Sequence, residues 1–186
     1  MVACVLRQKK YSNNNRNAMA SLTRKQQQAL ARLQQMACID FTGPALIEPV
    51  LHELHQLIFF DTGGYFHPGS DGAMDAYLEP SHARSQFHLY FQPEVMASER
   101  KVIRRSAHDF AGAVREDWGP QVMDELITVP LSGLLRSDFY NLALRPAELL
   151  DCLSLVLRSP QGAGVGALKL YRGPFAPRFG ADDAAT

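Results

Sequence analysis

The sequence predicts a single domain of the α/β class, more narrowly α+β, in which helices flank a central antiparallel sheet. Its 186 residues match the usual length of one domain. Helical apolar spacing occupies the first part of the chain, strand-like runs between turn residues follow, and a strand–loop–strand pattern lies near the end. Antiparallel strands at two places in the order, with helices elsewhere, favour one sheet covered by helices.

Residues 1–20 are predicted to be a disordered basic leader ahead of the folded domain. Seven Lys or Arg residues and no acidic residue precede Asp40, although the whole chain has a formal net charge of zero. The segment 11–17 is too polar to bury apolar area. A basic arm could also touch nucleic acid or a membrane surface, and Met19 is an alternative start of the chain.

Two helices are expected at the beginning of the domain. The segment 21–40 has apolar residues at helical spacing, with Ser21 or Thr23 as the candidate cap. Thr42-Gly43-Pro44 interrupts the pattern. A second helix is expected to be regular from Pro49 onward, because proline is tolerated in the first turn of a helix.

Three short strands in an antiparallel meander are expected next. They cover residues 57–61, 65–67 and 74–78. Thr62-Gly63-Gly64 stands between the first two and predicts a tight hairpin, since the favoured hairpin turns need a positive φ. Residues 68–72 form the second turn.

The middle of the chain predicts a helix followed by a mixed region. Ser98 is the candidate cap of a helix in which Ile103 and Val114 belong to one apolar stripe. Trp118-Gly119-Pro120 ends it, and residues 122–135 give no single pattern.

A short helix and a pair of strands are expected in the last third. Asp138 is the candidate cap of a helix that continues through Leu144. Residues 153–158 alternate as a strand does, and residues 165–171 provide its partner after a loop rich in glycine.

No arrangement of residues indicates a catalytic or metal site, so no catalytic residue, metal ion or cofactor is predicted and the chain is not expected to be an enzyme. His52 and His55 are three residues apart, whereas the zinc-protease helix places its two histidines four apart. There is no G-x-S-x-G nucleophile motif. Cys4, Cys38 and Cys152 form no C-x-x-C pair and predict reduced thiols in a cytoplasmic protein. No apolar run approaches the roughly 20 residues of a membrane span.

The decapeptide S-D-F-Y-N-L-A-L-R-P at residues 137–146 resembles a stretch found in GAF-like sensor domains. Those domains precede the helix-turn-helix of LuxR-type bacterial transcription regulators. Residues 60–66 resemble the opening hairpin of that family, and residues 155–158 with 166–172 resemble its closing hairpin. The resemblance covers residues 21–175 as an ordered series of features.

The resemblance implies a GAF-like sensor domain over residues 21–175 that binds a small molecule of unknown identity in a pocket between sheet and helices. Ligand in that pocket would bias how the helices pack. The family continues into a helix and a helix-turn-helix, where this chain has residues 176–186, expected as a flexible tail. Contact with DNA is therefore expected only through a helix-turn-helix that this chain lacks. The Gln-rich helix 21–40, with its apolar stripe, is expected to form a homodimer.

Seven residues are candidates for ligand binding, because apolar walls with a few polar anchors make a pocket. They are Phe60, Tyr65, Trp118, Phe139, Tyr140, Asn141 and Arg145. Arg145 could hold a carboxylate, or form a salt bridge that fixes the end of its helix. Asn141 could contact ligand, or cap the backbone, and the aromatic residues could simply fill the core. A ligand-free module for dimerisation or protein interaction is the alternative function.

Overall fold

The computed structural model describes most of the chain after residue 21. By their contacts, the described residues fall into two compact units. The first contains those before residue 60 together with residues 159 and 161–162, and the second contains the rest. The described ranges are 22–37, 44–69, 74–80, 83, 85, 88–105, 109–159 and 161–185.

The first unit contains the helices α2 (Arg24–Ala37) and α3 (Ile47–Leu54), with a 3₁₀ turn at Pro44–Leu46 before α3. Thr23, one of the two candidate caps, caps α2, and the other candidate, Ser21, lies outside the described residues. Thr23 Oγ1 accepts a hydrogen bond from Gln26 N, and the Gln26 side chain accepts one from Thr23 N, which is a reciprocal capping arrangement. The expected helix is present, although its predicted end at residues 38–40 lies outside the described residues.

An ion pair joins α2 to α3 within this unit. Arg32 Nε and Nη2 donate to the two carboxylate oxygens of Glu53, each at 2.7 Å. The hydrogen bond from Arg32 is the main cause that lowers the pKa of Glu53. Pro49 lies in the first turn of α3, as predicted.

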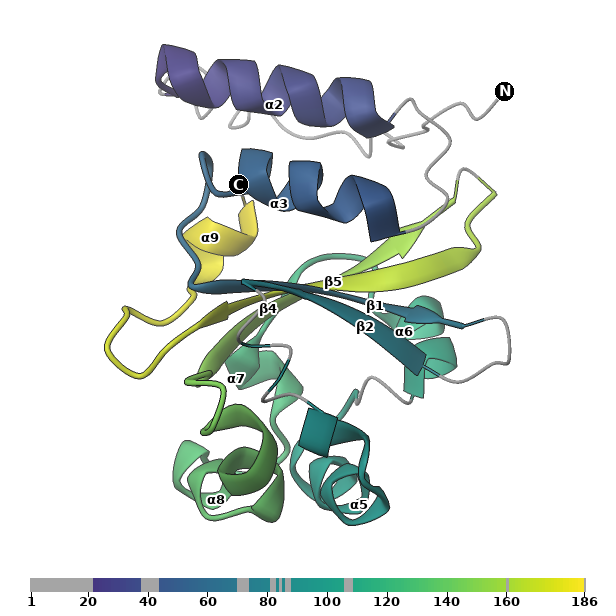
Figure 1. The fold of residues 1–186 in the computed structure, drawn as a ribbon, viewed down its shortest axis with the longest axis vertical. Helices are drawn as coiled ribbons and strands as arrows, with labels where there is room; N and C mark the ends of the chain where they lie inside the picture. The colour runs from purple at the N-terminus through teal and green to yellow at the C-terminus, as the bar shows by residue number, and fades with distance from the viewer. Residues whose placement is uncertain are drawn as a thin grey trace. The chain divides into compact units, whose positions relative to one another are not determined.

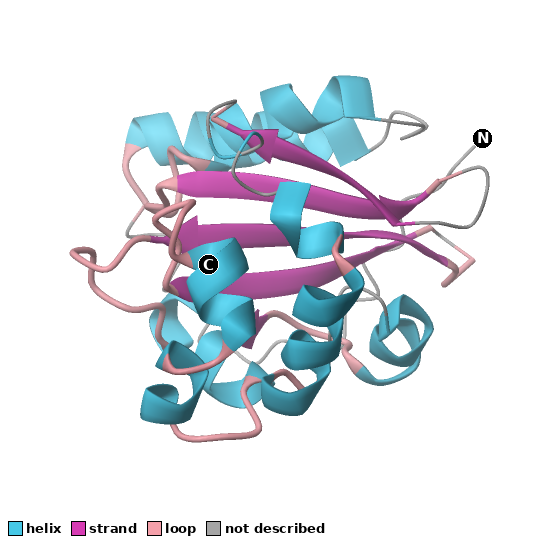
Figure 2. Cartoon of the chain, turned by 60° about the horizontal axis from the view of Figure 1, so that its bottom comes forward, coloured by secondary structure: helices cyan, strands magenta, loops and turns pink. Residues whose placement is uncertain are grey.

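The second unit is built on a five-stranded antiparallel sheet in the order β2-β1-β5-β4-β3 (Figure 2). The fold class is therefore α+β, as the sequence predicts. The strands are β1 (Thr62–Pro68), β2 (Met74–Glu79), β3 (Gln121–Val122), β4 (Asp151–Arg158) and β5 (Gly164–Arg172).

One face of this sheet, here called the inner face, packs against helices of the same unit. Because side chains alternate along a strand, the register places Phe66, Leu78, Cys152 and Tyr171 together on it. These side chains belong to the main apolar core. Figure 1 shows α5 (Pro93–Val102), α7 (Met123–Leu126) and α8 (Leu131–Leu135) below the sheet.

The second unit contains two further helices, α6 (Phe110–Glu116) and α9 (Ala181–Ala185). It also contains a 3₁₀ turn at His88–Phe91 and a π-helical turn at Tyr140–Leu144.

The expected strand at 57–61 and the hairpin turn at Thr62-Gly63-Gly64 are wrong. Residues 55–57 continue α3 as a turn, and the first strand begins only at Thr62. Gly63 is paired on both sides, with Glu79 of β2 and Leu170 of β5, so the backbone is extended there. One of these two partners, β5, lies roughly a hundred residues later in the chain, so no local sequence pattern predicts that it pairs with β1.

The predicted helix capped by Ser98 is also wrong. Ser98 lies in the middle of α5, where its hydroxyl accepts a hydrogen bond from Phe139 N. The chain is extended at Ile103, so the expected stripe from Ile103 to Val114 is divided. A separate helix, α6, begins after Asp109, whose carboxylate accepts a hydrogen bond from Gly112 N.

The short helix near residue 140 is present, but Asp138 does not cap it. Ser137 Oγ accepts the hydrogen bond from Tyr140 N. The turn is π-helical, because Arg145 N donates to Tyr140 O five residues earlier. The predicted hairpin of the last third is confirmed as β4 and β5, with Gly162 at φ 86° in the connecting loop.

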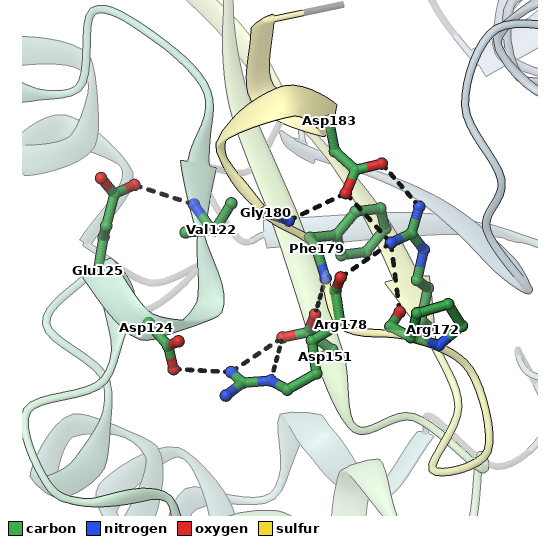
Figure 3. Close-up of polar contacts among 10 residues, drawn as sticks. Val122, Asp124, Glu125, Asp151, Arg172, Arg178, Phe179, Gly180 and Asp183 are labelled. Atoms are coloured by element: carbon green, nitrogen blue, oxygen red, sulfur yellow. Dashed lines mark hydrogen bonds and ion pairs between the residues drawn. The ribbon is translucent and has the colours of Figure 1, made fainter.

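A polar network joins β4 and β5 to the segment that the sequence assigned to a tail (Figure 3). Asp151, at the start of β4, accepts hydrogen bonds from Phe179 N and from the guanidinium of Arg178. Arg172, at the end of β5, makes two hydrogen bonds to Asp183 of α9, at 2.9 and 3.2 Å. Residues 178–183 are therefore attached to the neighbouring strands β4 and β5.

Candidate ligand-binding site

Two adjacent hollows lie on the inner face of the sheet, within the second unit. The first is bounded by the strands, α6 and α7, and the second by the strands, α5, α7 and the π-helical turn. Three side chains, those of Phe66, Leu126 and Lys169, line both hollows. The walls are mostly apolar with a few polar groups, which is the usual make-up of a small-molecule pocket.

The side chains fill most of this space. The first hollow covers about 410 Å³ of space between atoms, including solvent at its mouth, and the second about 380 Å³. In each, only about 20 Å³ is open to the centre of a water molecule, which is room for one or two waters. A larger ligand would therefore need the shared wall to move.

Lys169 occupies the middle of the inner face on β5. The residues paired with it are small, Gly64 on β1 and Ser154 on β4, so neither neighbour covers its side chain. Its Nζ lies 5.2 Å from the centroid of the Phe66 ring, a cation–π contact. Among the described residues, no carboxylate forms an ion pair with Lys169, and no hydrogen bond of its ammonium is present.

A buried tyrosine–glutamate pair forms part of the second hollow. Tyr90 Oη lies 3.0 and 2.9 Å from the two carboxylate oxygens of Glu99, whose side chain is in α5. Both residues are almost fully buried.

A second tyrosine, Tyr171 of β5, also lines this hollow. Burial, followed by the charges of Cys152 and Glu99, raises the pKa of Tyr171 well above its ordinary value, so its phenol stays protonated at neutral pH.

The cation of the first hollow, Arg105, is balanced by carboxylates. It forms ion pairs with Asp109, Glu116 and Asp117. Its Nε is buried and makes no hydrogen bond with the part of the chain that the structure describes. Arg105 thus adds a polar wall to this hollow without adding net positive charge.

The structure places the four candidates from the decapeptide differently. Phe139 lines the second hollow and lies 6.1 Å from the Tyr90 ring, centroid to centroid. Tyr140 is half-buried and packs against the same core. Asn141 Nδ2 donates to the carbonyl oxygens of Leu135 and Ser137, which is the backbone capping considered as its alternative role.

Arg145 is exposed, and its Nη1 donates to Asn141 Oδ1 at 3.4 Å. The other three candidates are not among the residues that line the hollows. Phe60 is buried just before β1, and Tyr65 lies on the face of the sheet opposite to Phe66, where its hydroxyl donates to Val165 O. Trp118 is 73% exposed under the guanidinium of Arg158.

Sequence reasoning missed the residues that line both hollows. Phe66 and Lys169 are each adjacent to a residue of the opposite face, so only the correct strand register separates Phe66 from Tyr65. One signal was available: Lys169 is the one charged residue between Gly164 and Tyr171, in a strand that is otherwise apolar or glycine. An internal charge in such a strand is a candidate site residue.

No metal or membrane feature is present in the described part of the chain. No three His, Cys, Asp or Glu side chains there gather in a way that could hold a metal ion. His52 on α3 and His55 in the turn that follows it are both exposed. None of the described helices has the length and apolar character that crossing a membrane requires.

The comparisons with known proteins add one fold-level similarity. No protein-family model matches the sequence, and no curated protein matches it. Among solved structures, the chain is similar to the crystal structure of the N-acylhomoserine lactone dependent LuxR family transcription factor CepR2 from Burkholderia cenocepacia. The identity is 14%, the similarity covers 87% of this chain and 83% of that one, and the TM-score is 0.47. The GAF-like assignment stays a prediction.

Proposed function

We propose that this chain is the ligand-sensing part of a bacterial transcription regulator, and that a small molecule binds on the inner face of the sheet. The observation that carries the proposal is the pair of hollows separated by Phe66, Leu126 and Lys169. Apolar walls provide affinity by burial, while a few polar groups orient a ligand. The regulatory role is inferred from the resemblance of residues 137–146 to sensor domains.

A ligand in these hollows would change the packing of helices rather than undergo a reaction. The hollows are bounded by α5, α6 and α7, so filling them requires these helices or their side chains to move. A ligand shifts such an equilibrium only by its difference in affinity for the two states. We propose a binding role without catalysis, with the homodimer and the DNA contact of a separate helix-turn-helix as further parts of the same proposal.

The test is native mass spectrometry of the freshly purified chain and of two leucine variants. Ser154→Leu places a larger apolar side chain on the inner face in the first hollow, and Ser132→Leu makes the same change on the exposed surface of α8. We expect wild type and Ser132→Leu to carry a small-molecule mass that Ser154→Leu loses. The same bound mass in all three proteins would place the ligand elsewhere and contradict the proposal.

The ligand-free interaction module is supported by a different observation, the small free space in each hollow. A filled core of this kind stabilises a fold without any ligand. Unchanged thermal stability of the wild type across a library of small acids, alcohols and lactones, together with a bare mass, would favour the module.

A further inference from the structure

We propose that the ligand of this site is a small monocarboxylate with an apolar chain or ring, and that Lys169 Nζ and Ser154 Oγ hold its carboxylate. The inference rests on the proposed function and specifies its ligand class. The apolar part of the ligand would lie along Phe66 and Leu126, which line both hollows.

The first step is the charge of the inner face. Lys169 supplies an ammonium that no described carboxylate neutralises, whereas Arg105 has three acidic partners. Lys169 is half-buried, so its ammonium is partly removed from water without an ion-pair partner among the described residues, and a bound anion would supply that partner. The ring of Phe66 offers only a weak substitute at 5.2 Å.

The second step is the hydrogen-bonding capacity next to the ammonium. Ser154 is paired directly with Lys169 across β4 and β5, on the same face. The Ser154 hydroxyl makes no hydrogen bond with another described residue, and its side chain lines the first hollow. An ammonium and a hydroxyl on neighbouring strands can donate to the two oxygens of one carboxylate.

The third step limits the charge of the ligand to one. Glu99 lines the second hollow and Asp117 lines the first, so acidic side chains lie on both sides of Lys169. A phosphate or dicarboxylate would place its second negative charge beside one of them, with no second unpaired cation among the described lining residues. A single carboxylate matches the single available ammonium.

The fourth step is how space opens. Because Phe66 and Lys169 belong to the wall that both hollows share, a movement of these two side chains would join the hollows. Gly64, paired with Lys169, has no side chain to hinder that movement. The carboxylate would then replace the Phe66 ring as the partner of the ammonium.

The experiment compares octanoate with 1-octanol as probes, using isothermal titration calorimetry on the full chain. The two molecules share an apolar chain and differ in the carboxylate. We expect wild type to bind octanoate at least about tenfold more tightly than 1-octanol, since a hydrogen bond to a charged group has that order of effect. Lys169→Met should remove this preference and leave the affinity for 1-octanol unchanged.

Two further variants complete the design. Lys169→Arg keeps the charge and should retain the preference for octanoate, while Lys101→Met makes the methionine change at an exposed position of α5 and should have no effect. Circular dichroism checks that each variant is folded. Equal affinities of wild type for the two probes, an unchanged preference in Lys169→Met, or no octanoate binding by wild type would each overturn the inference. If the calorimetry gave one of these results but native mass spectrometry still showed a bound small molecule that Ser154→Leu loses, the proposed function would stand and only the ligand class would be wrong.

Discussion

Asp151 is a buried carboxylate that attaches the segment after β5 to the sheet. Its side chain is 3% exposed and accepts hydrogen bonds from Phe179 N and Arg178, whereas Asp124, which also pairs with Arg178, is 63% exposed (Figure 3). Removing a buried charge that has several donors costs far more stability than breaking an exposed ion pair, because water screens the exposed pair and can replace its partners. The two aspartates therefore form a matched pair for experiment.

Asp151→Asn should destabilise the protein by about 3 kcal/mol, because it removes the negative charge that accepts from the buried Phe179 N and from the guanidinium of Arg178. Asp124→Asn should cost under about 1 kcal/mol. Urea unfolding followed by circular dichroism measures both. Equal losses of stability in the two variants would show that the position of Asp151 in the core has no special effect.

Cys152 should resist alkylation in the folded protein. Burial is the main cause that raises its pKa to about 12, with a smaller contribution from Asp151 that Lys169 opposes. At pH 8 only about one thiol in ten thousand would be a thiolate, against roughly a quarter for an unfolded cysteine with its ordinary pKa. Iodoacetamide should therefore modify Cys152 at least about a thousandfold faster in 6 M urea than in buffer.

The measurement needs a variant in which Cys4 and Cys38 are replaced by serine, so that mass spectrometry reports on Cys152 alone. Because the pKa of Cys152 is raised above this range, its thiol stays protonated, and the rate of its alkylation in the folded protein should stay low from pH 7 to pH 9. Rapid modification of the folded protein at pH 8 would mean that Cys152 is accessible or ionised.

At the scale of elements, β5 is the central strand, and its close packing with β1 depends on one glycine. A Cβ atom added at Gly166 would lie 2.6 Å from Cζ of Tyr65, whose hydroxyl donates to Val165 O. The strand therefore leaves room for an aromatic ring of its neighbour where a side chain would stand. This contact gives Tyr65 a packing role on the face opposite to the candidate site.

Gly166→Ala should destabilise the protein by about 1–3 kcal/mol, because the ring of Tyr65 must move and the sheet is tightly packed there. Gly119→Ala is the control, since nothing lies within 4 Å of the added atom, and it should change stability by less than about 0.5 kcal/mol. Thermal unfolding of the two variants gives the comparison. A neutral Gly166→Ala would mean that Tyr65 is not confined.

At the scale of the whole molecule, dimerisation through α2 stays a prediction. Ala29 of α2 is fully buried and Leu33 and Met36 are half-buried, while α2 lies beside α3 and is joined to it through Arg32 and Glu53 (Figure 1). The apolar stripe expected to mediate the dimer thus already has a partner within the first unit. A dimer through α2 would therefore use the exposed, Gln-rich surface of that helix.

Light scattering on the purified chain should report about twice the chain mass of 20.7 kDa if α2 forms the homodimer. Ala31→Arg, at an exposed position of α2, should then lower the mass to that of one chain, while Ser132→Arg on α8 should not. A wild type of 20.7 kDa at high concentration would reject the dimer.

The sequence by itself determined the elements whose signals are local. The helix α2, the strands β2, β4 and β5 and the loop between the last two follow from apolar spacing and from turn residues a few positions apart. It also determined the fold class, since two groups of antiparallel strands with helices elsewhere leave few arrangements.

Only the tertiary structure decided the candidate site. Gly63 and Gly64 are strand residues because β2 and β5 pair with them, and Phe66 rather than Tyr65 faces the hollows because the register of β1 against β5 places it there. The role proposed for Lys169 depends on its pairing with Gly64 and Ser154, which are 105 and 15 residues away in the sequence. The physical reason is that side-chain direction in a strand changes with a shift of one residue, and pairing between distant segments sets that register.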